Sequence, residues 1–162
     1  MGLFIFVLLI ILGVGYPKSK GVTKLNAIFM FIVLGLNTKA SDLGQYENVY
    51  ENLFAQGLQF HYEPGYSLFM TVCRTLGFSF FTFRLIWALL IVVIINAAIH
   101  RFTDNTALAS SLYILYSLLP LTSGMRMAMS SVIAIYGVSF LAERKDRKKA
   151  ILLLFLSAMF HY

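Results

Sequence analysis

Hydrophobic residues occur in six runs that polar segments separate along the chain. A bilayer core of about 30 Å needs roughly 20 helical residues, and the run at 79–99 has that length. The runs at 3–15 and 25–36 are short for spans. The sequence therefore predicts an all-α, polytopic membrane helix bundle, with residues 1–162 forming a single integral membrane domain. The predicted spans are 3–15, 25–36, 79–99, 107–122 (broken near its end by Pro120), 127–141 and a sixth that begins at Ala150.

The sixth run reaches the end of the sequence after about 13 residues, or roughly 20 Å of helix at 1.5 Å per residue. That length is too short to cross a bilayer. We therefore expect the chain to be the N-terminal portion of a longer protein, truncated within its sixth span. A re-entrant or interfacial tail is the alternative.

The long segment between the second and third spans predicts two short helices at the membrane surface. Asp42, Tyr46 and Tyr50 recur at i, i+4 and i+8, which is one face of a helix. Ser41 is the predicted N-cap, because its hydroxyl can accept a free backbone N–H. This first helix is either an amphipathic helix at the interface or a surface helix with a packed tyrosine stripe.

The second short helix is predicted to begin at Pro64, which suits the first helical turn. Glu63 precedes it, near the positive end of the helix dipole. There the carboxylate could be a general base, an acceptor for a sugar hydroxyl or simply a cap. The helix carries an apolar stripe of Leu68, Phe69, Val72 and Leu76.

Composition supports the membrane assignment. Of the 162 residues, 59% are hydrophobic and only 12% are charged, against about 25% charged in soluble domains. This excludes an ordinary soluble domain and a disordered protein. The single cysteine, Cys73, excludes an intrachain disulfide and a cysteine-based zinc cluster.

The net charge of +6 is concentrated in alternate loops, which predicts the orientation. Loops after the first, third and fifth runs hold nine of the 13 Lys and Arg residues but three of the seven acids. The positive-inside rule places these loops in the cytoplasm and the N-terminus outside. The charge therefore records topology, and no nucleic-acid partner is expected. The nine basic residues are Lys18, Lys20, Lys24, Arg101, Arg144, Lys145, Arg147, Lys148 and Lys149.

Two further residues are candidates for chemistry on the outer side. Arg126 opens the fifth span with no acid beside it in the sequence. It is either a snorkelling interfacial arginine or a phosphate ligand, because the guanidinium presents a planar fork of donors. His161 is either a packed core residue or a proton carrier. Arg84 near the start of the third span is predicted to snorkel toward the headgroups.

Five short motifs in this order resemble the EpsG family of Wzy-like polysaccharide polymerases. The resemblance covers about residues 37–162. The sequence contains no phosphate-binding glycine loop, no H-E-x-x-H zinc motif and no G-x-S-x-G motif that would compete with it. The motifs are Asp42-x-x-x-Tyr46, Glu63-Pro64-Gly65-Tyr66, Met125-Arg126, LAER at 141–144 and Ala158-Met159-Phe160-His161.

The resemblance implies a glycosyl transfer at the outer face of the bacterial cytoplasmic membrane. Such enzymes polymerise undecaprenyl-diphosphate-linked oligosaccharide repeats in exopolysaccharide, capsule or O-antigen synthesis. They release a lipid diphosphate and require no cofactor or metal. Expected partners are the lipid-linked substrate, the lipid bilayer and other polysaccharide-assembly proteins.

The same resemblance suggests roles for the motif residues. Arg126 would stabilise the departing diphosphate, and His161 would be a supporting donor. Asp42 or Glu63 would accept the proton of the attacking hydroxyl. Tyr46 and Tyr66 would line the path of the sugar.

Two other functions fit the sequence. One is a truncated, inactive remnant or a non-enzymatic accessory subunit of a polysaccharide-assembly machine, which the short sixth run favours. The other is a small transporter of lipid-linked sugars. A transporter is expected to carry charges along a path inside the membrane, whereas the charges here cluster at helix ends.

Overall fold

The computed structural model describes residues 2–38, 40–54, 62–142 and 146–161, with their side chains except those of 2–3 and 117–123. Regular structure in these ranges is entirely α-helical, which confirms the predicted fold class. Two of the helices, α5 and α7, are long and apolar enough to cross a membrane. The elements are α1 (Gly2–Gly15), α2 (Lys20–Leu36), α3 (Leu43–Glu51), α4 (Pro64–Thr75), α5 (Phe80–Phe102), α6 (Thr106–Ser123), α7 (Met125–Ala142) and α8 (Arg147–Ala158).

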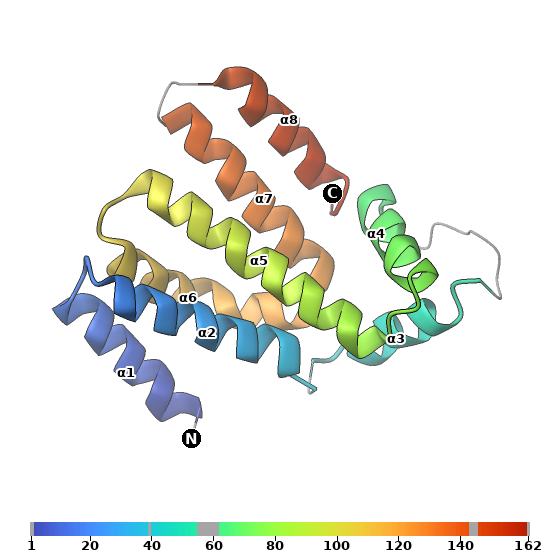
Figure 1. Cartoon of the computed structure of the whole chain (residues 1–162), viewed down its shortest axis with the longest axis horizontal. Coiled ribbons are helices and arrows are strands. Elements are labelled where there is room, and N and C mark those ends of the chain that lie inside the picture. Colours follow the sequence, from blue (N-terminus) through green and yellow to red (C-terminus); the bar gives the residue numbers. More distant parts are fainter. Residues whose placement is uncertain (1, 39, 55–61, 143–145, 162) are drawn as a thin grey trace.

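Helix α5 lies at the centre of the bundle (Figure 1). It packs against α2 and α7, while α6 packs against α1 and α2, and α8 packs against α7. The α1–α2 and α5–α6 turns lie at one end of the bundle, together with the end of α7 and the start of α8. The short helices α3 and α4 lie at the opposite end. The fold therefore separates the basic loops of the sequence from its Tyr- and Glu-containing segment.

Two helices begin earlier than the hydrophobic pattern predicts. Helix α2 begins at Lys20, because Ser19 caps it by accepting a hydrogen bond from the backbone N–H of Val22 (3.3 Å). Helix α8 begins at Arg147, where Asp146 accepts from the N–H of Lys149 (3.1 Å). In both helices, basic residues occupy the first turn or turns, before the apolar run begins.

Helix α6 continues through Pro120 to Ser123, so the predicted break at this proline is wrong. Proline removes one backbone donor, yet helices in membranes tolerate it because neighbouring groups satisfy the freed carbonyl. The turn to α7 follows at Gly124. The α6–α7 turn therefore lies directly before Arg126.

A buried polar cluster joins α1, α2 and α6. The Asn26 side-chain amide donates to the hydroxyls of Ser110 (2.7 Å) and Ser111 (2.9 Å). Ser111 in turn donates to the carbonyl of Leu9 (2.9 Å). Because a polar group in an apolar interior must be paired, this cluster fixes the register of the three helices.

Aromatic side chains dock α3 and α4 onto the start of α5. The Tyr50 ring lies 5.0 Å from that of Phe83, and its hydroxyl donates to the carbonyl of Phe78 (2.9 Å). The Tyr66 ring meets Trp87 edge-on, with 5.0 Å between ring centroids. The predicted apolar stripe of α4 is divided: Leu68, Val72 and Leu76 are 60%, 47% and 64% exposed, whereas Phe69 packs against Phe83 and Trp87 of α5. An exposed apolar face on a short helix is typical of a membrane-surface position.

Two side chains from the first turns of α5 hold the ends of neighbouring helices. Arg84 is buried, and its guanidinium donates to the carbonyl of Asn37 at the end of α2. The prediction that Arg84 snorkels is therefore wrong, because the guanidinium is buried against the end of α2 instead of reaching toward the headgroups. The Trp87 indole N–H donates to the carbonyl of Met125 at the start of α7 (3.0 Å).

A backbone contact joins the start of α4 to the end of α8. The N–H of Gly65 donates to the carbonyl of Met159 (2.8 Å). A Cβ at Gly65 would lie 2.8 Å from that carbonyl oxygen and 3.0 Å from the Met159 Cβ. Only glycine allows this approach without displacement of one segment, and the contact brings Glu63 and His161 together.

We therefore expect Gly65→Ala to separate the two segments and to destabilise the protein by about 1–3 kcal/mol, as overpacking does. Gly44→Ala in α3 is the matched control, because a Cβ there meets nothing within 4 Å. Thermal unfolding of the purified protein in detergent measures the effect. Equal unfolding midpoints for the two variants would contradict the close contact.

Candidate functional site

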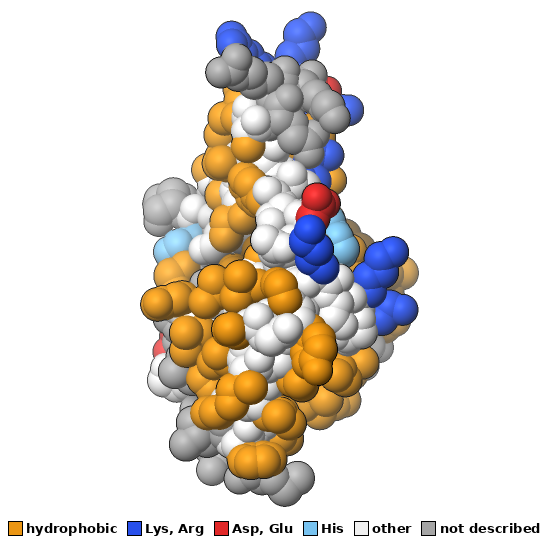
Figure 2. All heavy atoms as spheres, turned by 90° about the vertical axis from the view of Figure 1, so that its left-hand side faces the viewer, with side chains coloured by type: hydrophobic (Ala, Val, Ile, Leu, Met, Phe, Trp, Pro, Cys, Tyr) orange, Lys and Arg blue, Asp and Glu red, His pale blue; other side chains and the backbone are white. Residues whose placement is uncertain are grey.

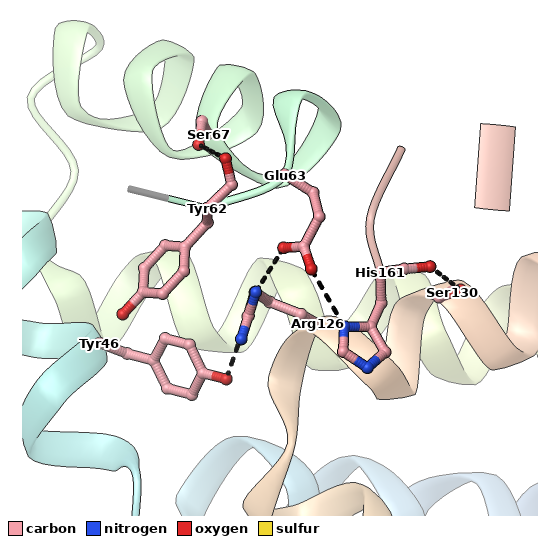
Figure 3. Close-up of polar contacts among 7 residues, drawn as sticks. All are labelled: Tyr46, Tyr62, Glu63, Ser67, Arg126, Ser130 and His161. Atoms are coloured by element: carbon pink, nitrogen blue, oxygen red, sulfur yellow. Dashed lines mark hydrogen bonds and ion pairs between the residues drawn. The ribbon is translucent and has the colours of Figure 1, made fainter. Parts of the chain in front are cut away.

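The Glu63 carboxylate connects three segments of the chain. Pro64 occupies the first turn of α4, which leaves Glu63 extended as the residue before the helix. Its side chain is only 5% exposed, and both oxygens have partners (Figure 3). One oxygen, Oε2, lies 2.5 Å from Nη1 of Arg126, and the other, Oε1, lies 3.0 Å from Nδ1 of His161. These partners come from the start of α7 and from the residues after α8.

Arg126 is held in place by side chains from α3, α5 and the segment before α4. The Trp87 contact to Met125 fixes the first turn of α7, which carries Arg126. The Arg126 Nε donates to the Tyr46 hydroxyl of α3 at 3.5 Å. The guanidinium carbon lies 4.6 Å from the centroid of the Tyr62 ring, a cation–π distance. The arginine therefore has a fixed orientation.

The sequence has no acid beside Arg126, but the fold supplies one. Its partner Glu63 is 63 residues away in the sequence and adjacent only in the fold. The buried carboxylate needs a cation, because an unpaired buried charge is strongly unfavourable. The simple snorkelling interpretation of Arg126 therefore does not describe its environment.

A cavity of about 270 Å³ opens beside this ion pair. Arg126 keeps 27% of its side chain exposed, so one part of the guanidinium faces the cavity while another binds Glu63. Four of the predicted site residues line it. The lining residues are Asp42, Tyr46, Gly124, Arg126, Met127 and His161.

Asp42 contributes an exposed carboxylate to this cavity. It is the residue before α3, and its side chain caps no backbone N–H of that helix. Ser41 donates a hydrogen bond to Asp42 Oδ1 (2.8 Å). The prediction that Ser41 caps the helix is therefore wrong, because its hydroxyl is used to orient the aspartate.

His161 is placed beside the carboxylate rather than in the core. Its side chain is 40% exposed, and its backbone carbonyl accepts a hydrogen bond from Ser130 of α7 (3.4 Å). Together with the Gly65–Met159 bond, this contact fixes the chain after α8 against both α4 and α7. The imidazole thus reaches both Glu63 and the cavity.

Two tyrosines pack beside the site without lining the cavity. Tyr66 is fully buried and does not line the cavity; its hydroxyl lies 3.9 Å from the Met125 sulfur. Tyr62 was not among the predicted site residues, yet its ring contacts Arg126 and lies 5.5 Å from the Tyr46 ring. Its position directly before Glu63 was the available signal. The Tyr62 hydroxyl is buried and has no hydrogen-bond partner among the described residues.

The electrostatics of the site favour an ionised Glu63. Burial alone raises the pKa of this carboxyl. The hydrogen bonds from its own backbone, Arg126 and His161 together with the Arg126 charge outweigh burial and hold the pKa below its ordinary value. Glu63 is therefore a carboxylate at neutral pH, and it serves as the fixed counter-charge of Arg126.

The arrangement has the parts of an anion site next to a proton acceptor. The exposed part of Arg126 can bind phosphate oxygens, while Asp42 and His161 line the same cavity and can exchange protons. Among the described residues, no group of three or more His, Cys, Asp or Glu side chains is suited to hold a metal. The cavity can therefore hold an anionic group beside a carboxylate and an imidazole.

Comparison with known proteins identifies one family. No curated protein and no solved structure matches the chain. The model of the EpsG family matches residues 25–162, which is most of the sequence and includes every residue of the site. The chain therefore belongs to the EpsG family.

Proposed function

We propose that this protein polymerises lipid-linked oligosaccharide repeats at the outer face of a bacterial cytoplasmic membrane, in exopolysaccharide, capsule or O-antigen synthesis. Membership in the EpsG family indicates a polysaccharide polymerase-like role in a membrane. The proposal rests on the cavity that the partly exposed Arg126 guanidinium shares with the exposed carboxylate of Asp42. The arginine would stabilise a diphosphate leaving group, and the aspartate would accept the proton of a sugar hydroxyl.

The proposed orientation has the site outside and the N-terminus on the same side. Figure 2 faces the opposite end of the molecule, where Lys and Arg side chains lie at the top, at the centre and along the right edge, and hydrophobic side chains cover most of the lower part. The predicted cytoplasmic loops flank helix ends at this basic end, whereas α3 and α4 lie at the other end. The positive-inside rule thus supports an external site.

In the proposed reaction, Arg126 binds the diphosphate of an undecaprenyl-diphosphate-linked chain. The hydroxyl of the acceptor sugar attacks the anomeric carbon and forms the glycosidic C–O bond. The bond between the anomeric carbon and the phosphate oxygen breaks, and its electron pair remains on the diphosphate. Arg126 stabilises the charge that develops there, and no nucleotide or metal is required.

Asp42 is the proposed acceptor of the hydroxyl proton, because its carboxylate is exposed to the cavity whereas that of Glu63 is buried and occupied by Arg126 and His161. Glu63 orients those two residues. His161 is a supporting donor to the substrate. Tyr46 lines the sugar path. Tyr66 has no exposed surface, so it supports that path only by packing. Other polysaccharide-assembly proteins are the proposed partners.

Replacement of the cavity arginine tests this assignment. In cells whose polysaccharide depends on this protein, Arg126→Gln should abolish long-chain polymer, because a neutral amide cannot stabilise the leaving diphosphate. Arg126→Lys should restore little, since it lacks the planar fork. Polymer length on gels, with the amount of protein in the membrane, measures the effect. Arg74→Gln is the control, because Arg74 is paired with Glu51 outside the cavity (2.7 Å).

Loss of Arg126 also leaves the buried Glu63 unpaired, so a folding defect must be separated from a catalytic one. The double variant Glu63→Gln with Arg126→Gln removes both charges. We expect it to accumulate in the membrane and still to make no long polymer. Wild-type polymer length in either neutral variant would contradict the proposed role of Arg126.

Cysteine labelling tests the proposed orientation. In a Cys73→Ala background, single cysteines at Gln45 of α3 and Lys148 of α8 occupy exposed positions at opposite ends of the bundle. A membrane-impermeant maleimide added to intact cells should modify the cysteine at position 45 and leave that at 148 unmodified until the cells are opened. The reverse pattern would place the site in the cytoplasm and contradict the proposal.

A further inference from the structure

A second concave surface lies between α2 and α5, away from Glu63. It is an open groove of about 340 Å³, which is in the size range of small-molecule sites. One wall is the face of α2 that carries Lys20, Lys24 and Ala27 at helical spacing, and the other is the face of α5 that carries Val92, Val93 and His100. The groove therefore follows the length of two antiparallel helices.

The groove is basic at its mouth and apolar beyond it. Lys20 and Lys24 lie in the first two turns of α2, and His100 lies in the last turn of α5, at the same end of the bundle. All three are exposed, and none forms an ion pair with an acid among the described residues. Ala27 lies seven residues after Lys20, and Val92 lies eight residues before His100. At 1.5 Å per residue, both are roughly 10–12 Å from the mouth along their helices.

The polar groups inside the groove are already satisfied by the protein. The Thr23 hydroxyl contacts the Ser19 carbonyl (3.0 Å) and the Thr106 hydroxyl (2.9 Å). The Asn96 amide donates to the carbonyl of its own helix at Val92 (2.8 Å). These groups do not require a polar ligand, so the wall beyond the mouth behaves as an apolar surface.

We propose that an anionic phospholipid occupies this groove. Its phosphate lies between Lys20, Lys24 and His100, and an acyl chain follows Ala27, Val92 and Val93 into the membrane. Lys20 and Lys24, which have no acidic partner among the described residues, select a lipid with net negative charge over a zwitterionic one, because juxtamembrane lysines attract anionic headgroups. This inference concerns neither the reaction nor the outer site, and it stands whether or not the protein is a polymerase.

Lipid binding to the purified protein tests the inference. Wild-type protein in detergent is titrated with phosphatidylglycerol or phosphatidylcholine, and retained lipid is counted by native mass spectrometry. We expect selective retention of phosphatidylglycerol. Lys20→Gln with Lys24→Gln should weaken it on the order of thirtyfold, which corresponds to the loss of two headgroup-facing lysines. Arg147→Gln with Lys148→Gln is the control, with the same charge change at the same end of the molecule but outside the groove.

A second variant tests the apolar part of the groove without a change of charge. Val93 is 56% exposed, so Val93→Phe is expected to fold normally and to obstruct the acyl chain. It should reduce retention of phosphatidylglycerol, whereas inorganic phosphate alone should not stabilise the wild-type protein. The inference is wrong if the lysine variant retains phosphatidylglycerol like the control, if wild-type protein retains both lipids equally, or if Val93→Phe has no effect.

Discussion

The buried carboxylate of Glu63 is the constraint on which the outer end of the molecule depends. A buried anion requires neutralisation, and Glu63 obtains it from Arg126 at the start of α7 and contacts His161 after α8. The same requirement explains the surroundings. Trp87 anchors the first turn of α7, and the missing side chain of Gly65 lets α4 approach Met159. Three segments distant in the sequence thus meet at one charge.

Buried and exposed charges have different roles in this arrangement. Glu63 orients Arg126 from the interior side, while the remaining exposed surface of the guanidinium and the Asp42 carboxylate face the cavity. A preorganised cation costs no reorganisation when negative charge develops in a reaction. The aromatic rings of Tyr46, Tyr62 and Tyr66 pack against one another, and Tyr46 and Tyr62 also contact Arg126. The basic groove between α2 and α5 shares no lining residue with this cavity.

The sequence was sufficient for the helical class, the central span α5 and the family, because hydrophobic length and short motifs are local signals. The helical spacing of Asp42 and Tyr46 also predicted the helix that brings them to the cavity. Contacts between distant segments could not be predicted. Which helix ends meet decides three contacts: Glu63 with Arg126, Arg84 with the end of α2, and Tyr62 with Arg126. Hydrophobic periodicity carries no information about which helix ends meet. Helix starts at Lys20 and Arg147 were missed because caps, not hydrophobicity, set them.

In the proposed reaction, Arg126 is held by Glu63 and binds a diphosphate. Binding of a polyprenyl diphosphate to the purified protein in lipid nanodiscs, followed by calorimetry, measures this directly. We expect the diphosphate to bind more tightly than the monophosphate. We also expect the double variant Glu63→Gln with Arg126→Gln to lose about 10-fold to 100-fold in affinity, because charged hydrogen bonds are lost. Equal affinity in this variant and in the wild-type protein would contradict this role of Arg126.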